Sequence, residues 1–308
     1  MPQQVDTVRL LTTQTALGNR RIRVADLFDA PDLIEKTGIE HVYEAEESTT
    51  SLAVKACRKI PNLQARPIKL CLMVTQTPDD FLPANAIDLG NQIGLPSNII
   101  AFDLNQGCSG FVQALCLVER LLDYYSETLL VTADRYRSKL DQADRSTNSV
   151  FSDAATATVC ATDNRLGIIY EDHYTDGAKR NLLFQSASKE DNNGHLHMSG
   201  AEIWMFTRLQ VVPQIQKAIQ YCEDNDLKIA GVYLHQASRI VVHGIKKFLP
   251  VDKSIVFENY HIHGNTVSST IPFLLKEHPL DETGGTTVSI LAGFGVGLTS
   301  SVIVYGEK

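Results

Sequence analysis

The stretch around Cys108 has the residue types and spacing of a nucleophilic cysteine. An apolar run over 99–104 has the length of a buried strand, and apolar residues at helical spacing follow from Phe111 to Leu122. Cys108 is therefore expected where a strand leads into the N-terminus of a helix, whose dipole can lower the pKa of the thiol. Gly107 and Gly110 leave room around the sulfur for a substrate. A structural cysteine between two turn glycines is the alternative for this stretch taken alone.

Three other stretches carry groups that can act on a bound substrate. His235 directly follows an apolar strand-like run, at the carboxyl end where open α/β sheets place their sites. Asn265 precedes a helix-like run in a cap-like position. Residues 293–297, Gly-Phe-Gly-Val-Gly, predict a turn rich in accessible backbone amides. Taken singly, these stretches also fit a core histidine, a helix cap and a hairpin turn.

Strands and helices alternate along the chain, which is typical of α/β proteins with crossover helices on a mostly parallel sheet. The first half predicts strands over 68–75, 99–104 and 128–133 and helices over 48–60, 84–93 and after Cys108. The second half predicts strands over 229–234, 254–256, 287–292 and 300–305 and helices over 200–218 (interrupted near Pro213), 237–249 and 266–276. The run 167–173 is expected to form a hairpin with the strand before it. Because the order of elements recurs, we expect an internal duplication, with halves at 1–165 and 166–308.

Composition narrows the classes of function. The net charge of −8 argues against non-specific nucleic-acid binding. Six widely spaced cysteines without a CxxC pair suit reduced thiols, and the chain lacks an apolar run of about 18 residues, so we expect a cytoplasmic protein without a membrane span. His261 and His263 alternate as in a strand but have no further ligands at zinc spacing, so no metal site is expected.

Together these stretches resemble the β-ketoacyl-acyl-carrier-protein synthase III family of the thiolase superfamily. The resemblance runs from Val24 to Val304. It rests on Gln106-Gly-Cys108-Ser-Gly-Phe111, Asp144-Arg145, His235-Gln-Ala237, His263-Gly-Asn265-Thr266 and Phe294-Gly-Val-Gly297, in the family's order and spacing. The histidine and asparagine distinguish this branch from elongating ketosynthases, which use two histidines. The resemblance implies an α/β, thiolase-like fold of two pseudo-duplicated halves with αβαβα layers.

The resemblance implies a first, acyl-loading step at Cys108. The thiol would attack an acyl thioester and carry the acyl group, which divides one difficult reaction into two easier ones. The backbone amides of Cys108 and of the loop with Gly295 and Val296 would form the oxyanion hole. Coenzyme A or phosphopantetheine thioesters are then substrates, and no separate cofactor is expected.

The second implied step is decarboxylation of a malonyl unit held by an acyl carrier protein. His235 and Asn265 would hydrogen-bond the malonyl thioester carbonyl and stabilise the enolate that remains when carbon dioxide departs. Phe294 would crowd the malonyl carboxylate and favour its loss by desolvation. The carbanion would then attack the acyl-cysteine.

The chain also departs from the family's pattern. The family often has a tryptophan before Thr37-Gly38 that sandwiches the adenine of coenzyme A with an arginine; here Arg145 is present, but the only tryptophan is Trp204. The acyl donor is therefore either acyl-CoA or carrier-bound. Leu82 matches the position where a partner subunit inserts an aromatic to floor the acyl pocket, which implies a homodimer and a deeper or branched pocket. Gln76 stands where hydroxymethylglutaryl-CoA synthases carry a catalytic glutamate, which argues against that relative.

A basic helix face follows the catalytic histidine. Arg239, His243, Lys246 and Lys247 fall on one side of the helix expected over 237–249. The resemblance places carrier docking there, and an acidic carrier would need such a patch on a chain of net charge −8. A solvated helix face is the alternative.

Three functions fit the sequence. The first is a decarboxylating Claisen condensation between an acyl thioester and malonyl-acyl carrier protein. The second is a thiolase-fold acyltransferase that moves the acyl group from Cys108 to an alcohol or amine. The third is a non-catalytic partner subunit, against which the intact cysteine, histidine and asparagine argue. The acyl primer and the pathway stay open.

Overall fold

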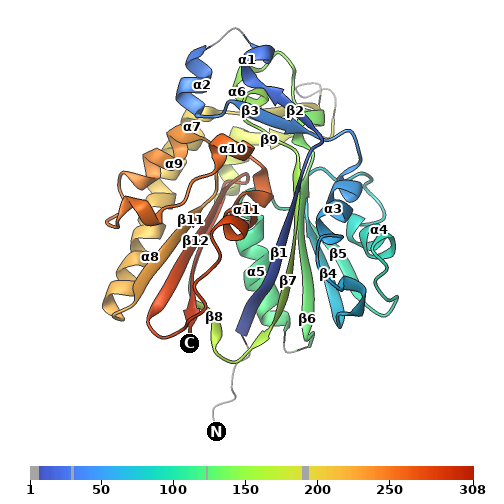
Figure 1. Ribbon diagram of the computed structural model, residues 1–308. Coiled ribbons are helices and arrows are strands. Elements are labelled where there is room, and N and C mark those ends of the chain that lie inside the picture. Colours follow the sequence, from blue (N-terminus) through green and yellow to red (C-terminus); the bar gives the residue numbers. More distant parts are fainter. Residues whose placement is uncertain (1–6, 29–30, 123, 189–193) are drawn as a thin grey trace.

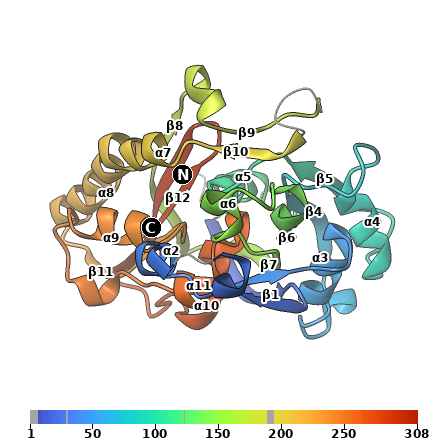
Figure 2. The same cartoon turned by 90° about the horizontal axis from the view of Figure 1, so that it is seen from above.

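Two β-sheets lie side by side, with helices between them and on both outer faces (Figure 1). The computed structural model describes residues 7–28, 31–122, 124–188 and 194–308. Seen from above, the layers follow one another as helices, sheet, helices, sheet and helices (Figure 2). This is the layered α/β architecture expected from the sequence.

The first sheet is built from the N-terminal part of the chain in the order β1-β7-β6-β4-β5. Its strands are β1 (Thr7–Leu17), β4 (Ile68–Val74), β5 (Ile100–Leu104), β6 (Glu127–Asp134) and β7 (Ala154–Asp163). β4 runs parallel to β5 and β6, whereas β7 runs antiparallel to β1 and β6. The outer face is covered by α3 (Thr49–Cys57), which begins at its predicted cap Ser48, and by α4 (Asn85–Gln92).

The second sheet has the order β11-β12-β13-β8 and uses residues after 165. Its strands are β8 (Leu166–Thr175), β11 (Lys228–Leu234), β12 (Thr287–Gly295) and β13 (Thr299–Glu307). Helices α8 (Val212–Asp224) and α9 (Arg239–Lys246) cover its outer face. The hairpin expected for 167–173 is wrong, because the chain crosses to the other sheet after β7 and β8 pairs with β13. Of the strand expected over 254–256, only Val256 pairs, in an isolated parallel bridge with Val232, because Lys253–Ile255 is a 3-10 turn.

Two helices lie between the sheets, and the N-terminus of one of them directly follows Cys108. α5 (Gly110–Leu121) and α11 (Thr270–Glu277) bury apolar side chains against both neighbouring layers. In α5 the buried positions are Gly110, Phe111, Val112, Ala114, Leu115, Cys116 and Val118. A helix surrounded by protein needs such an apolar surface on more than one side.

Short elements gather over one end of the layers (Figure 1). They include β2 (Arg20–Arg23), α1 (Val24–Leu27), α2 (Pro31–Thr37), β3 (His41–Glu44), α6 (Arg145–Asn148), β9 (Leu183–Gln185), β10 (Leu196–Met198), α7 (Gly200–Phe206) and α10 (Tyr260–His263). Shorter 3-10 turns lie at Leu63–Ala65, Tyr136–Lys139, Gly177–Leu182 and Val267–Ser269. A π-helical turn, Thr207–Val211, joins α7 to α8, so the predicted helix over 200–218 is three segments. Within the described ranges, none of the helices has the length and apolar character needed to cross a bilayer.

Candidate active site

Cys108 lies in the turn between β5 and α5, where the sequence placed it. The thiol-bearing residue is only 7% exposed. A Cβ added at Gly295 would lie 2.9 Å from its sulfur, and one added at Gly293 would lie 2.8 Å from the Cα of Ser109. The end of β12 therefore packs directly on Cys108, and only glycine leaves the necessary space.

The expected lowering of the Cys108 pKa is wrong for this chain. Burial raises the pKa of the thiol to about 12, and the carboxylate of Asp134 adds to the rise. Hydrogen bonds from the backbone amides of Cys108 and Val296 to the sulfur act in the opposite direction but are weaker. The thiol is therefore protonated at neutral pH, because loss of solvation outweighs these dipoles. The same two amides are the ones that the resemblance assigns to the oxyanion hole.

His235 continues β11 and is buried beside the ring of Phe294. Its amide donates to the carbonyl of Ala292 on β12 at 2.9 Å, which fixes the backbone. Its Nδ1 lies 2.8 Å from the hydroxyl of Thr270, and the two rings meet edge-on with centroids 5.4 Å apart. Burial lowers the pKa of His235 to about 3, so the imidazole is neutral at pH 7.

Asn265 is held in a short turn between α10 and α11. Its backbone amide donates to Val150, and its carbonyl accepts from Ser152, which ties it to the start of β7. Its side-chain Oδ1 accepts from the amide of Val267 at 3.0 Å, so the amide nitrogen is the end left for a substrate. Val267 has φ +55°, a left-handed conformation that is rare for a β-branched residue. Strain of this kind is concentrated at functional sites.

The loop after β12 is fixed to the same helix terminus as Cys108. Phe294 is 2% exposed. Thr299 donates its hydroxyl to the carbonyl of Val296 at 2.8 Å, and the same hydroxyl lies 2.7 Å from that of Ser109. This small network holds Val296 and the end of β12, with Phe294 and Gly295, beside Cys108. The turn expected over 293–297 is shorter than predicted, because β12 continues to Gly295 and pairs there with Thr299.

Asp134, the last residue of β6, is a buried carboxylate that the sequence analysis missed. Its oxygens accept from the amide of Gln76 at 2.8 Å and from the hydroxyl of Ser268 at 2.5 Å. Burial raises its pKa to about 7 despite these hydrogen bonds, and its charge acts on Cys108. An acidic residue closing an apolar strand next to the site was the available signal.

A hollow of about 390 Å³ lies beside Val296 and Gly297, the residues that follow β12. Its lining comprises Gln76, Asn105, Tyr136, Arg180, Leu183, Phe184, Gln185, Leu196, Val296 and Gly297. Gln76 accepts a hydrogen bond from the phenol of Tyr136 at 2.7 Å. A side chain on Gly107 would collide with Gln76, so the amide of Gln76 lies against the turn that carries Cys108.

The two predicted substrate-binding residues, Leu82 and Arg145, are not among the residues that line this hollow. Leu82 is 86% exposed, and its neighbour Phe81 is 91% exposed, so this loop points into solvent in the single chain. The guanidinium of Arg145 lies 5.9 Å from the centre of the Phe28 ring. Phe28 is thus the aromatic partner of Arg145, where the family's pattern suggested a tryptophan.

The predicted carrier-docking residues lie on α9 and just after it, but their charges differ in availability. Lys246 is paired with Glu258 at 2.5 Å, and His243 lies 3.0 Å from the same carboxylate. Arg239 donates to the carbonyl of Glu35 on α2. Lys247 is exposed and lies 5.9 Å from the centre of the Phe248 ring. The positive patch is therefore smaller than the sequence suggested.

Comparison with known proteins decides the family. A model described as 3-oxoacyl-[acyl-carrier-protein] synthase III matches residues 102–177, and one described as the C-terminal part of that protein matches 223–306. The β-ketoacyl-[acyl-carrier-protein] synthase III of Lactococcus lactis is 31% identical over 285 residues, which cover 87% of each chain. The chain belongs to the 3-oxoacyl-[acyl-carrier-protein] synthase III family.

Further synthase III proteins agree with this assignment. The enzyme of Clostridium perfringens is 30% identical, with 94% of each chain covered. The solved 3-oxoacyl-(acyl-carrier protein) synthase of Burkholderia xenovorans has a TM-score of 0.87 at 25% identity and covers 98% of this chain. The match also includes 94% of the Burkholderia chain. The thiolase-like fold is therefore confirmed. The matched ranges of the synthase III models include Cys108, His235, Asn265 and Phe294.

Proposed function

We propose that this chain is a decarboxylating ketoacyl synthase that joins an acyl thioester to the malonyl group of malonyl-acyl carrier protein. The observation that supports it best is the packing of Cys108 against the amide of Val296, on the same loop as Phe294, whose ring contacts His235. A structural cysteine would need neither this close approach nor the neighbouring neutral histidine. The relatives described as β-ketoacyl-[acyl-carrier-protein] synthase III support the same reaction class.

In the loading step, the sulfur of Cys108 attacks the acyl carbonyl and the donor thiol leaves. The proton of the Cys108 thiol departs on the sulfur of that donor, so the charges balance. The amides of Cys108 and Val296 donate to the carbonyl oxygen as its charge develops. Arg145 with Phe28 offers a cation and a ring for the donor's adenine, which supports acyl-CoA as donor.

In the condensing step, the malonyl carboxylate leaves as carbon dioxide and the electron pair moves to the thioester enolate. His235, neutral at pH 7, and the side-chain amide of Asn265 hydrogen-bond the enolate oxygen. Phe294 keeps water and cations away from the carboxylate, which destabilises its charge. The carbanion attacks the acyl-cysteine, and Cys108 leaves as thiolate and is then protonated.

Further features of the proposal concern the setting of the enzyme. An acyl carrier protein approaches Arg239 and Lys247 beside the entrance. A homodimer forms, in which Phe81 and Leu82 of one chain enter the partner. A reducing compartment such as the cytoplasm suits the six buried free cysteines. Resident cofactors and metals have no part in the two steps.

The decisive experiment combines mass spectrometry with release of labelled carbon dioxide. We expect acyl-CoA to add one acyl group at Cys108 and malonyl-carrier protein then to release label. Cys108→Ala should lose the adduct. An acylated enzyme that transfers its acyl group to an alcohol or amine, without releasing label from malonyl-carrier protein, would overturn the condensation in favour of acyl transfer. A chain that accepts no acyl group from CoA or carrier donors would be a non-catalytic subunit.

A further inference from the structure

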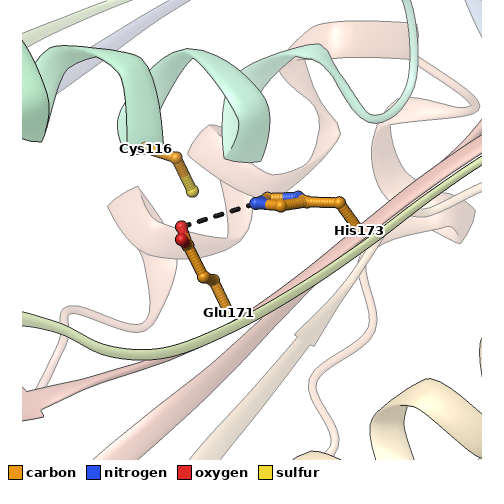
Figure 3. A group of neighbouring side chains, drawn as sticks. All are labelled: Cys116, Glu171 and His173. Atoms are coloured by element: carbon orange, nitrogen blue, oxygen red, sulfur yellow. Dashed lines mark hydrogen bonds and ion pairs between the residues drawn. The ribbon is translucent and has the colours of Figure 1, made fainter.

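Cys116, Glu171 and His173 form a cluster outside the active site (Figure 3). Cys116 comes from α5, and the other two lie on β8, two residues apart on the same face of the strand. One ligand atom from each of the three lies within 4.8 Å of the other two. The sulfur, a carboxylate oxygen and an imidazole nitrogen point toward a common centre (Figure 3).

A shallow hollow of about 340 Å³ opens directly over this cluster. It is lined by Gln113, Cys116, Leu117, Arg120, Glu171 and His173. Cys116 itself is 5% exposed, whereas the side chains of Glu171 and His173 are 33% and 42% exposed. An ion could therefore enter the hollow from solvent and reach the buried thiol and the two more exposed groups. Cys116 is eight residues, about two helical turns, beyond Cys108, so this hollow is distinct from the acyl site.

The spacing of the two β8 side chains already suits a metal ion. Nε2 of His173 lies 3.4 Å from Oε2 of Glu171. Two ligands at about 2.0–2.1 Å from a tetrahedral ion are about 3.3–3.4 Å apart. Nδ1 of His173 lies 3.0 Å from the hydroxyl of Ser301 on β13, an outer contact that turns Nε2 toward the cluster.

One group opposes a cation here. Arg120 donates from Nη2 to Oε1 of Glu171 and from Nη1 to the carbonyl of Cys116. These bonds leave Oε2 of Glu171 on the His173 side. A thiolate and a carboxylate together balance the two charges of a divalent ion, and Glu119 lies near enough to Arg120 to act on its charge. Arg120 therefore holds Glu171 in position. With a divalent ion bound, the ion, the thiolate, the carboxylate and Arg120 together carry a net charge of at most one positive unit.

We propose that Cys116, Glu171 and His173 bind one zinc ion, with a water molecule in the fourth position. A mixed set of sulfur, nitrogen and oxygen donors with three protein ligands is one that zinc accepts, whereas magnesium and calcium prefer oxygen ligands alone. Binding replaces the proton of the Cys116 thiol, which is released to solvent. The ion would connect the central helix α5 to the second sheet, a role separate from the condensation reaction.

The test is a metal titration of the full chain in the Cys108→Ala background, so that the catalytic thiol cannot contribute. After treatment with a chelator, Co²⁺ is added and the spectrum recorded, and Zn²⁺ is then used to displace it. We expect one ion per chain, a near-ultraviolet band from sulfur bound to cobalt, and displacement by one equivalent of Zn²⁺. Elemental analysis after gel filtration gives the zinc content independently.

Variants separate this site from adventitious binding. Cys116→Ser should remove the sulfur band, and His173→Asn should weaken Zn²⁺ binding at least tenfold, a loss of the size expected for a disturbed zinc site. The matched controls are Cys222→Ser, a buried cysteine of α8, and His41→Asn of β3; both should bind as the parent does. If Cys116→Ser fails to fold, His173→Asn still decides, because its side chain is 42% exposed. Unchanged affinity in His173→Asn, a cobalt spectrum without the sulfur band, or less than half an ion per chain would overturn the proposal.

Discussion

Cys108 and His235 are both uncharged in the resting chain at neutral pH. Burial holds the thiol pKa near 12 and the imidazole pKa near 3. A charged thiolate–imidazolium pair, as in many cysteine hydrolases, is therefore not the starting state. A neutral N–H donor suits an enolate, whose negative charge appears only when carbon dioxide leaves. If the proposed condensation takes place here, hydrogen bonds aimed at oxygen atoms, rather than a stored charge, would stabilise its transition state.

The roles of His235 and Asn265 can be separated from acyl loading. Asn265→Ala and His235→Ala each remove one hydrogen-bond donor from the enolate, which typically costs about 10²–10³ in rate. We expect label release from malonyl-carrier protein to fall by that amount, while acylation of Cys108 falls much less. Asn225→Ala, at an exposed helix end, is the control. A His235→Ala chain that loads slowly but condenses normally once loaded would show the assignment to be wrong.

Asp134 predicts a measurable pH effect on Cys108. Its pKa of about 7 means that the carboxyl is charged above that pH and neutral below it. The charge raises the pKa of Cys108, so it suppresses the thiolate only in the upper range. Asp134→Asn should therefore speed alkylation of Cys108 by iodoacetamide at pH 8 about threefold to tenfold, since one pKa unit is tenfold in thiolate, with little change at pH 6.

The control for that measurement is Asp153→Asn. Asp153 is also buried, and its pKa is raised to about 6, but its oxygens accept from the amides of Ala45 and Arg137 instead. Equal alkylation rates for Asp134→Asn and the parent across pH 6–9 would mean that the Asp134 charge does not reach the sulfur.

The places of Cys108, His235 and Asn265 in the fold were predictable from sequence, whereas their protonation states were not. Cys108, His235 and Asn265 stand at junctions between apolar runs and turns, and a periodic pattern locates such junctions. The pKa of Cys108 depends on how much water the second half of the chain removes from it, and on Asp134 from another strand. Neither effect can be predicted from the residues around Cys108, so the expected direction of its pKa shift was wrong.

Among the secondary-structure elements, the central strands and helices were predicted well from the sequence, and the connections between them poorly. α10 covers Tyr260–His263 where alternating histidines suggested a strand, because four residues are too few for either period to be distinctive. β8 pairs with β13, not with the preceding β7, since pairing between sheets depends on distant residues. The cluster of Cys116 with β8 was hidden for the same reason.

Helix α9 shows how an element changes a prediction made from residues. Lys246 already pairs with Glu258, so Lys246→Glu would bring two carboxylates together and disturb the helix. Lys247 is the better probe because it is exposed. We expect Lys247→Glu to raise the KM for malonyl-carrier protein severalfold and to flatten its salt dependence, without changing loading from a small thioester.

Lys217→Glu on α8 is the matched control, since Lys217 is also exposed and lies on the same outer layer. If Lys247→Glu and Lys217→Glu have the same KM for the carrier at low salt, the carrier docks on another surface.

For the whole molecule, the exposed pair Phe81 and Leu82 is the clearest reason to expect a second copy. β5 and β8 are the end strands of their sheets, and Ile100 on β5 is 47% exposed. An apolar loop tip beside a sheet edge is a costly surface for a lone chain. Pairing of two chains would bury it and would bring Leu82 to the partner's acyl pocket.

Leu82→Phe tests that arrangement through substrate choice. The larger ring should shorten the pocket, so the ratio of kcat/KM for long over short acyl-CoA primers should fall, while the sedimentation coefficient stays that of the parent. Leu11→Phe, a partly exposed position on β1, should leave the ratio unchanged. An unaltered chain-length profile in Leu82→Phe would remove Leu82 from the acyl pocket.

The contact between the helix terminus at Cys108 and the last residues of β12 also limits how this sequence can vary. Side chains at Gly293 and Gly295 would come within 3 Å of Ser109 or Cys108, whereas side chains at Gly177 and Gly200 would meet nothing within 4 Å. In a saturation library selected for condensation, we expect sequencing to recover only glycine at 293 and 295 and many residues at 177 and 200. Broad tolerance at 295 would refute the close contact. Two segments separated by some 185 positions thus constrain each other, so a substitution in one is tolerated only together with a compensating substitution in the other.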